Sequence, residues 1–250
     1  MFIQICSDLH LEFIQNRTWI KDHPLVPKGD ILVIAGDTFY IDEKLGALDF
    51  IKKVSDDFEA VYIVPGNHEY YGGYNIATAL QTTHESISKN VFLVNNYSET
   101  INGVHFVFST LWSRIQKNIL AIMRGMTDFR KIQFNKEKFT INHFNEIHDA
   151  CFEFIKREVK KEGKKIVVTH HLPSNLCNVN EFKDSVLNDA FCVDKTNFIL
   201  NSTIDYWVYG HSHRNLKDFK IGNTQMITNQ LGYIGKMEHS RFNLEKVIEL

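Results

Sequence analysis

Side chains that bind metal ions in proteins recur along this sequence of 250 residues, each time directly after a short apolar run. Five such runs end in aspartate, asparagine or histidine: Asp8 and His10, Asp37, Asn67 and His68, His170 and His171, and His211 and His213. These groups offer carboxylate and amide oxygens and imidazole nitrogens but no thiolate, a mixture that suits zinc, manganese, iron or cobalt. If the fold brings the run ends together, they can form a metal site.

The spacing within the motifs favours side chains that share one cavity. Asp8 and His10, like His211 and His213, are two residues apart, so both members of a pair can point the same way from an extended or turning segment. One aspartate at a strand end can bridge two cations. Two metal ions roughly 3.5–4 Å apart can hold a shared hydroxide and stabilise both oxygens of an in-line phosphoryl displacement. The pattern is therefore typical of phosphoester hydrolysis.

Each motif by itself also has a purely structural interpretation. Gly-Asp and Pro-Gly-Asn are common in turns, and the Ser and Asp of SDLH favour the N-terminus of a helix. The chain has 12 histidines, and six of them outside the motifs are expected in ordinary structural positions: His23, His84, His105, His143, His148 and His239. Only the ordered set of motifs indicates chemistry.

Hydrophobic periodicity indicates the elements that would position these residues. Short runs such as ILVIAG, VYIVPG and KIVVTH are typical of buried strands. Two segments repeat with a period near 3.6 and predict amphipathic helices: Leu45, Leu48, Ile51 and Val54, and Ile141, Phe144, Ile147, Cys151, Phe154 and Ile155. Alternating strands and helices predict an α/β layered domain with partly parallel sheets, covered by helices. In such folds a site lies beyond the carboxyl ends of the strands, where the five motifs are expected.

Composition predicts a single globular domain over residues 1–250, because 44% apolar and 23% charged residues are ordinary for this length. Residues 112–140 are less regular and are the candidate for an insertion or cap. Lysine and arginine total 28 against 30 acidic residues, a net charge of −2, so no overall charge attracts the chain to nucleic acid or to an anionic membrane.

The cysteines and the first residues favour a cytoplasmic location. Cys6, Cys151, Cys177 and Cys192 show no Cys-x-x-Cys spacing, which fits reduced thiols better than a disulfide framework or a thiolate zinc site. The stretch MFIQICSDLH lacks the charged start and cleavage site of a signal peptide, and no apolar run approaches membrane-spanning length. No membrane partner is expected.

In this order, SDLH, GD, GNHE, VTHH and GHSH resemble the motifs of the calcineurin-like metallophosphoesterase superfamily, from Asp8 to His213. Weaker similarity in MTDFRKIQF, DSVLNDAF and GNTQMITNQLGY indicates a largely uncharacterised bacterial branch. The resemblance implies two packed mixed β-sheets flanked by helices and a centre of two metal ions. By resemblance, the first metal is bound by Asp8, His10, Asp37 and His213, and the second by Asp37, Asn67, His170 and His211.

The resemblance also implies roles in hydrolysis. The nucleophile would be a hydroxide that bridges the metals, so no side-chain nucleophile is needed. His68 would donate a proton to the departing alkoxide or hydrogen-bond a phosphate oxygen, with Asp37 as the nearest carboxylate to orient it. His170 is the expected ligand because it comes first after its strand, whereas His171 either contacts phosphate or hydrogen-bonds a ligand.

Other residues are weaker candidates for substrate binding. Arg114 and Arg130 could bind phosphate through their guanidinium groups or could simply be solvated, and Asp128 could orient Arg130. A cluster of aromatic residues could wall a pocket for a ring, although packing is the favoured interpretation: Tyr70, Tyr71, Tyr74 and Trp112.

The function predicted from the sequence is hydrolysis of a small phosphomonoester or phosphodiester with two metal ions, drawn from Mn, Fe, Zn and Co. A nuclease of the same superfamily is the first alternative, disfavoured because the repair-nuclease branch usually carries a further domain and this chain stops at Leu250. A catalytically silent scaffold or sensor is disfavoured because every ligand and His68 are present. A nucleotide-binding module would need a Gly-rich phosphate loop, and none occurs. Nucleic acid is not expected as a partner, and the oligomeric state stays open.

Overall fold

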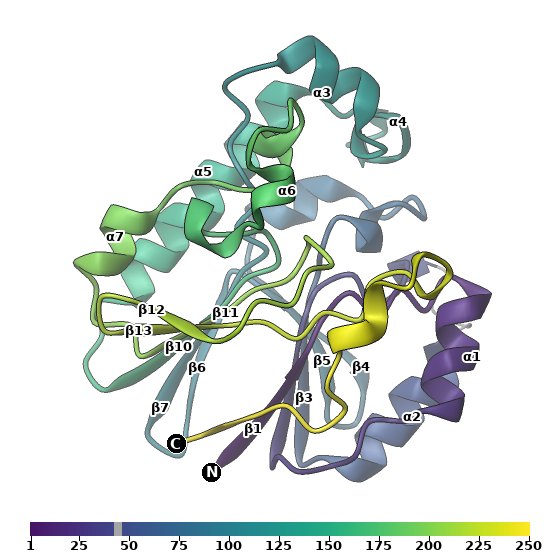
Figure 1. Cartoon of the computed structure of the whole chain (residues 1–250), viewed down its shortest axis with the longest axis vertical. Helices are drawn as coiled ribbons and strands as arrows, with labels where there is room; N and C mark the ends of the chain where they lie inside the picture. The colour runs from purple at the N-terminus through teal and green to yellow at the C-terminus, as the bar shows by residue number, and fades with distance from the viewer. Residues whose placement is uncertain (43–46) are drawn as a thin grey trace.

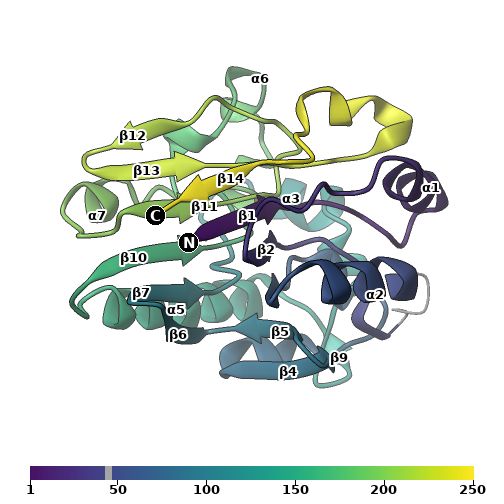
Figure 2. The same ribbon diagram turned by 90° about the horizontal axis from the view of Figure 1, so that it is seen from below.

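The computed structural model describes residues 1–42 and 47–250, and two six-stranded β-sheets form its centre. The first sheet has the order β14-β1-β2-β3-β5-β4: Val247–Glu249, Phe2–Cys6, Ile31–Ala35, Ala60–Val64, Val91–Asn95 and Thr83–Ser88. The second has the order β12-β13-β11-β10-β7-β6: Phe219–Ile221, Thr224–Ile227, Tyr206–Val208, Lys164–Val168, Val104–Phe108 and Tyr97–Ile101. Each sheet mixes parallel and antiparallel pairs, and helices flank both (Figures 1 and 2). The predicted fold of two mixed sheets flanked by helices is confirmed.

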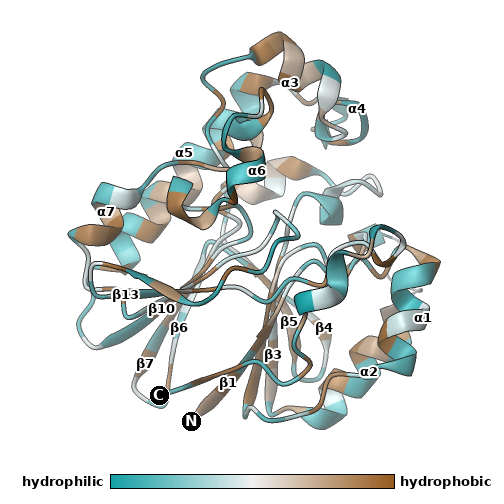
Figure 3. Ribbon diagram, viewed as in Figure 1, coloured by the Kyte–Doolittle hydropathy of each residue, from teal (hydrophilic) through white to brown (hydrophobic). Residues whose placement is uncertain are grey.

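The strand β2 shows why the apolar runs become buried strands. All five residues of ILVIA are buried, and they pair in parallel with β1 on one side and β3 on the other. Because successive side chains of a strand point to opposite faces, Leu32 and Ile34 join the cluster under the helices, whereas Val33 and Ala35 join the core between the sheets. A strand covered on both faces needs an apolar run without alternation. Figure 3 shows hydrophobic residues along the strands and mixed residues along the helices.

Helices cover the outer faces of both sheets. α1 (Ile14–Asp22) and α2 (Leu48–Asp57) lie against the first sheet, and α5 (Ile141–Glu158) and α7 (Thr196–Leu200) against the second. All six apolar positions predicted for α5 are buried. In α2, Ile51 and Val54 are buried, but Leu48 is 48% exposed, so the buried face begins one turn later than predicted. The predicted helix position Leu45 lies outside the described residues. Among the described residues, no helix is long and apolar enough to cross a membrane.

Residues 112–140 form a layer above the strand ends. They contain α3 (Ile119–Gly125), α4 (Asp128–Lys131) and a hairpin of β8 (Gln133–Phe134) and β9 (Glu137–Lys138). Figure 1 shows α3 and α4 at the top of the molecule, above α6 (Asn180–Lys183). Side chains of this layer pack with α5 in a hydrophobic cluster of their own. Short helical turns occupy several loops: η2 (His68–Tyr70), η3 (Ile76–Leu80), η4 (Asn175–Cys177), η5 (Asn188–Ala190), η6 (Ile234–Lys236) and η7 (Glu238–Arg241).

Candidate metal centre

The five motifs follow strands that run parallel to their neighbours, so their carboxyl ends lie at the same edge. β1, β2 and β3 are neighbours in the first sheet, and β10 and β11 are neighbours in the second. Five predicted ligands then take positive φ angles: Asp8 (55°), His10 (49°), Asp37 (54°), His211 (75°) and His213 (53°). Residues other than glycine rarely adopt this conformation, and such strain concentrates at functional sites. The backbone thus indicates a site at this edge.

The residues predicted for the first metal lie together. Asp8, His10, Asp37 and His213 each place one potential ligand atom within 4.8 Å of the others. Nε2 of His10 lies 2.9 Å from Nε2 of His213 and 3.7 Å from Oδ2 of Asp37. Nε2 of His213 lies 3.4 Å from Oδ1 of Asp8. The first predicted set is therefore brought together by the fold.

A second group contains Asp37, His170 and His211, with Asn67 beside it. Nε2 of His170 is 3.4 Å from Oδ1 of Asp37 and 3.0 Å from Nδ1 of His211. The same Nε2 is 3.3 Å from Oδ1 of Asn67. Asp37 thus faces the first group with Oδ2 and the second with Oδ1. A ligand that bridges two cations requires this sharing of one carboxylate.

Hydrogen bonds on the far side of two imidazoles orient them toward these groups. Nδ1 of His170 donates to the carbonyl oxygen of Ala35 at 2.8 Å, and Nδ1 of His213 donates to Oε2 of Glu238 at 2.7 Å. Because a carbonyl and a carboxylate only accept, Nδ1 carries the proton, and in the neutral ring Nε2 keeps its lone pair. Rings that bind metals in proteins are commonly held in this way.

The burial of the two groups of side chains suits them to bind metal cations. Asp8, His10 and His170 are fully buried, and Asp37 is 1% exposed. Burial alone would lower the pKa of His170, but the adjacent Asp37 outweighs it and raises that pKa to about 9. Carboxylates and imidazoles crowded out of water need protons or a cation between them. The described residues therefore fit two metal ions, and their oxygen and nitrogen donors match Mn, Fe, Zn or Co.

His68 is oriented by a residue that the sequence did not indicate. Nδ1 of His68 lies 2.7 Å from Oε1 of Glu12, which also lies 3.1 Å from Nδ1 of His10. Asp37, the carboxylate expected to orient this ring, instead accepts a hydrogen bond from the backbone N–H of His68 at 2.9 Å. Burial lowers the pKa of His68, but Asp37 and Glu12 outweigh burial and raise it. Nε2 of His68 lies 3.3 Å from the hydroxyl of Tyr233.

A cleft of about 410 Å³ opens over the two groups. The predicted site contributes one part of its lining: Asp37, Asn67, His68, His211 and His213. Residues 125–127 and several residues of the segment 178–191 contribute another part, and Tyr71 and Tyr233 are also in the lining. Tyr70 and Trp112 are instead buried in the cluster beneath residues 112–140, as the packing interpretation predicted. The groups that could hold metal ions therefore face a space large enough for a small ester.

A family model for calcineurin-like phosphoesterases matches residues 2–215. The chain belongs to this family. It is a metal-dependent phosphoesterase, and the resemblance inferred from the motifs is confirmed. The matched region contains every motif from SDLH to GHSH.

Two similar proteins extend the comparison. Uncharacterized protein L509 of Acanthamoeba polyphaga mimivirus is 30% identical to the phosphoesterase over 282 aligned residues, which cover 99% of this chain and 96% of that protein. The crystal structure of phosphopantetheinyl hydrolase (PptH) from Mycobacterium tuberculosis matches with a TM-score of 0.65 at 16% identity, over 98% of this chain and 95% of that one. This likeness shows a shared fold, and a shared fold leaves the substrate open.

Glu69 of the phosphoesterase holds two of the ligand loops together. Its carboxylate accepts hydrogen bonds from the backbone N–H groups of Asp37 at 3.0 Å, Thr38 at 2.6 Å and Gly66 at 2.7 Å. Burial and the nearby Asp37 raise the pKa of Glu69 to about 7. The sequence signal for this role is the position of Glu69 directly after His68 in the motif GNHE.

Asn67 is oriented by the layer of residues 112–140. Its Nδ2 donates to Oδ1 of Asp128 at 3.0 Å and to the hydroxyl of Tyr71 at 2.8 Å, which turns its Oδ1 toward His170. The hydroxyl of Tyr71 also donates to Asp128. The expectation that Asp128 orients Arg130 is therefore wrong, because the side chain of Asp128 contacts Asn67 and Tyr71 beside the candidate centre of the phosphoesterase.

The two arginines proposed as phosphate contacts lie elsewhere. Arg114 pairs with Asp149. Arg130 donates to the carbonyl oxygen of Arg124 at 2.8 Å and to Oγ1 of Thr127 at 3.2 Å. Neither guanidinium is among the described residues that line the cleft. The fold of the phosphoesterase does not bring them to the candidate centre.

His171 is fully buried behind His211. The two rings stack with their centroids 4.2 Å apart and an angle of 19° between them. Nδ1 of His171 accepts a hydrogen bond from the backbone N–H of Ser113 at 3.0 Å. Burial and the neighbouring His170 lower the pKa of His171 well below its usual value. His171 thus supports the position of a predicted ligand and is not among the described residues lining the cleft.

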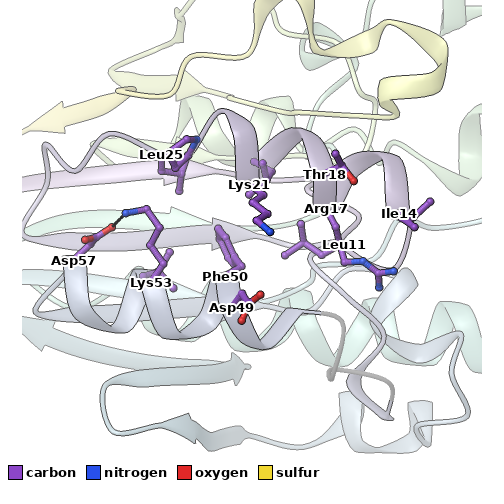
Figure 4. A pocket seen from close by; sticks show the side chains of 13 residues that line it. Leu11, Ile14, Arg17, Thr18, Lys21, Leu25, Asp49, Phe50, Lys53 and Asp57 are labelled. Carbon is purple, nitrogen blue, oxygen red and sulfur yellow. Dashed lines mark ion pairs between the residues drawn. The ribbon is translucent and has the colours of Figure 1, made fainter.

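A second hollow, of about 380 Å³, lies between α1 and α2 (Figure 4). Leu25 and Phe50 line it together with Arg17, and Lys53 forms an ion pair with Asp57 at 2.9 Å. Neither a histidine nor a predicted ligand is among its described lining residues. This hollow lacks the groups that hydrolysis by the phosphoesterase requires.

Proposed function

We propose that the chain hydrolyses a small phosphomonoester or phosphodiester at a centre of two metal ions. The proposed ligands are Asp8, His10, Asp37, Asn67, His170, His211 and His213. The single observation that carries the proposal is the carboxylate of Asp37, which faces one group with each oxygen. Two ions there would supply Lewis-acid stabilisation to the phosphoryl group and lower the pKa of water.

His68 is the proposed catalytic residue supplied by the chain. Its Nδ1 contacts Glu12, so its Nε2 is directed toward Tyr233 at the cleft. A protonated imidazole in this place can donate to the departing oxygen of the alcohol or hydrogen-bond a phosphoryl oxygen.

The lining of the cleft favours a small ester over nucleic acid. A backbone of many phosphates is bound by several lysines and arginines along a groove. Among the described residues that line this cleft, Lys236 is the only lysine or arginine. Nuclease action therefore stays the weaker alternative.

The compartment proposed for this reaction is the cytoplasm. Cys6, Cys151, Cys177 and Cys192 are all free and buried, which supports the expectation of reduced thiols.

Hydrolysis of p-nitrophenyl phosphate and bis-p-nitrophenyl phosphate tests the proposal. The chain is stripped with a chelator, reloaded with Mn, Fe, Zn or Co, and analysed for metal content. We expect two ions per chain and turnover that depends on them, with the faster ester assigning monoester or diester preference. Two bound ions without hydrolysis of these or natural esters would support the scaffold alternative.

A further inference from the structure

The cleft has a wall that carries no charge, which we call the neutral wall. It is formed by the junction of α3 with α4, which lies at the top of the molecule in Figure 1, and by those residues of the segment 178–191 that line the cleft. Its members are Gly125, Met126, Thr127, Asn178, Phe182, Ser185, Leu187, Asn188 and Phe191. None of these described residues is ionisable. Met126, Leu187 and the two phenylalanines give it a largely apolar surface.

The neutral wall is continuous with the metal centre. The ring of Phe191 stacks on the imidazole of His211, with centroids 4.7 Å apart and an angle of 29°. Leu187 packs directly on the start of the other segment, since a Cβ atom on Gly125 would lie 2.9 Å from Cδ2 of Leu187. An ester whose phosphoryl group lies at the centre would therefore place its alcohol portion against this wall.

Two side-chain amides give the wall a donor and an acceptor. Nδ2 of Asn178 donates to Oδ1 of Asn188 at 2.6 Å. Within the described part of the chain, Oδ1 of Asn178 and Nδ2 of Asn188 have no hydrogen-bond partner. An amide, or the edge of a nucleobase, offers the matching pair of groups. A carboxylate or phosphate offers acceptors only.

Charged groups in the cleft lie on the other side. Both oxygens of Glu238 are occupied, Oε2 by His213 and the backbone N–H of Tyr233, and Oε1 by Arg214. The ammonium of Lys236 lies 4.9 Å from the ring centroid of Tyr233. Because Tyr233 contacts His68, this cation lies beside the proposed phosphoryl position. The guanidinium of Arg214 lies 5.1 Å from the ring centroid of Phe182, but it pairs with Glu181 and Glu238 and is not among the described residues that line the cleft. The neutral wall therefore has no unpaired cation among its described lining residues.

We infer that the alcohol portion of the substrate is an uncharged group with apolar surface and an adjacent hydrogen-bond donor and acceptor, such as an amide. An additional anionic group would lose its hydration against the neutral wall, where it could accept a hydrogen bond from Nδ2 of Asn188 but would gain no counter-charge and would leave Oδ1 of Asn178 unpaired. This inference rests on the proposed function and names the class of ester within it. It also excludes substrates whose alcohol carries a carboxylate or a second phosphate.

Three phosphomonoesters of primary alcohols test the inference. They are N-hexanoylethanolamine phosphate, AMP and phosphoglycolate, which carry an amide, a nucleobase and a carboxylate. We expect kcat/KM for the amide ester to exceed that for phosphoglycolate by at least about tenfold, since a site built for paired donors and acceptors rejects groups that leave them unpaired. If AMP were the best substrate, the hydrogen-bond donor and acceptor of the wall would be assigned to recognition of a nucleobase. Preference for phosphoglycolate would overturn the inference.

Two lysine substitutions, one on the neutral wall and one beside it, form a matched pair of variants. Leu187→Lys is expected to reduce the preference for the amide ester by about tenfold, through a higher KM for that ester and a lower KM for phosphoglycolate. Val186→Lys adds the same charge one residue away, at a side chain that is 55% exposed and absent from the described lining, and should keep the preference. Equal effects of the two lysines would contradict the inference.

Binding separates failure of this inference from failure of the proposed function. If no ester is hydrolysed with any metal, saturation-transfer NMR of N-hexanoylethanolamine and glycolate with the whole chain still tests the wall. We expect signal for the acyl group, loss of that signal in Leu187→Lys and its retention in Val186→Lys. Signal that survives Leu187→Lys, or that is equal for glycolate, would exclude the neutral wall as the alcohol site.

Discussion

One oxygen atom of Glu12 contacts two histidines with different proposed roles. Its Oε1 contacts the proposed proton donor His68 and the proposed metal ligand His10, while its Oε2 is buried without a hydrogen-bond partner among the described residues. Burial raises the pKa of Glu12, but the hydrogen bonds from His10 and His68 outweigh it and lower that pKa. Glu12 therefore stays ionised beside the ring that it orients.

The loss of hydrolysis rate caused by a substitution of Glu12 should depend on the leaving group of the ester. We expect Glu12→Gln to slow hydrolysis roughly 10- to 100-fold, as loss of a partner that orients a site histidine commonly does. The loss should be larger for alkyl than for p-nitrophenyl esters, because a weakly acidic alcohol needs the proton from His68 to depart. Rates across a series of aryl and alkyl phosphates measure this, with the exposed Glu59→Gln as control. Uniform slowing would assign Glu12 to metal binding through His10.

Two substitutions at the centre should separate metal binding from proton transfer. Asp37→Asn weakens both proposed metal sites, so we expect loss of bound metal together with a fall in hydrolysis of more than about 100-fold. His68→Ala should keep the metal and slow hydrolysis by roughly 10²- to 10⁴-fold. Elemental analysis of the purified variants beside their turnover numbers measures both quantities. Normal metal content and activity in Asp37→Asn would refute the shared-carboxylate assignment.

The residues of the candidate centre differ in how well their roles can be predicted from the sequence. The proposed ligands became candidates because each lies in a motif that follows an apolar run, and the resemblance of the ordered motifs to a known family singled them out. Glu238 could not, because it reaches His213 from 25 residues further along the chain, through the turns η6 and η7. A carboxylate brought in by a loop has no periodicity that marks its target.

Among the elements, α4 has the most direct connection to the metal centre. It is a single short helix, and its first residue, Asp128, is fully buried and contacts Asn67 and Tyr71. The sequence suggested residues 112–140 as a candidate insertion or cap, which stays a prediction, and it paired Asp128 with its neighbour Arg130. The error has a physical reason: a short helix exposes neighbouring side chains to different surroundings, and only tertiary packing decides which one faces inward.

Removal of the Asp128 carboxylate should therefore reduce activity at the candidate centre, although Asp128 is not a proposed metal ligand. We expect Asp128→Ala to reduce hydrolysis roughly 10- to 100-fold, because the amide of Asn67 loses the acceptor that turns its oxygen toward the centre. The affinity for the more weakly held metal ion should fall as well, measured by titration into chelator-treated protein. Gln133→Ala, at an exposed position of the same segment, is the matched control. Unchanged activity in Asp128→Ala would show that Asn67 needs no external orientation.

At the scale of the whole molecule, strand and helix patterns predicted the layers but not their pairing. The burial of β2 on both faces follows from its unbroken apolar run, and the six buried positions of α5 follow from its period. The split of twelve strands between two sheets rests on contacts between distant segments, such as β1 with β14. The sequence alone contained no signal for that split, which came from the resemblance of the motifs.

Stability should depend on pH through Glu158, which connects the end of α5 to β6. Burial raises the pKa of Glu158, but hydrogen bonds from Lys161, Ser98 and Arg157 outweigh it and hold the pKa at about 2, below the ordinary 4.5. A carboxylate whose pKa is depressed by folding stabilises the fold fully above its unfolded pKa and loses this effect as the pH falls toward its folded pKa. Glu158 therefore stabilises the chain at neutral pH and progressively less between about pH 4.5 and 2.

Urea unfolding of Glu158→Gln measures this contribution. We expect the variant to unfold at a lower urea concentration than the unmodified chain at pH 7, with a difference that narrows at pH 3.5. Glu162→Gln, at a neighbouring exposed position, should leave the midpoint unchanged at both pH values. A difference that stays constant with pH would mean that packing, and not the charge, is what Glu158 contributes.

The candidate centre joins residues that are made far apart in time. Asp8 is synthesised 203 residues before His211, yet its carboxylate accepts hydrogen bonds from the backbone N–H of His211 at 3.0 and 3.1 Å and lies beside His213. Translation must therefore pass His211 before the second group of ligands is complete and His213 before the first is complete. A nascent or prematurely terminated chain that lacks these histidines cannot complete the candidate centre, so the proposed hydrolysis cannot begin before they are synthesised.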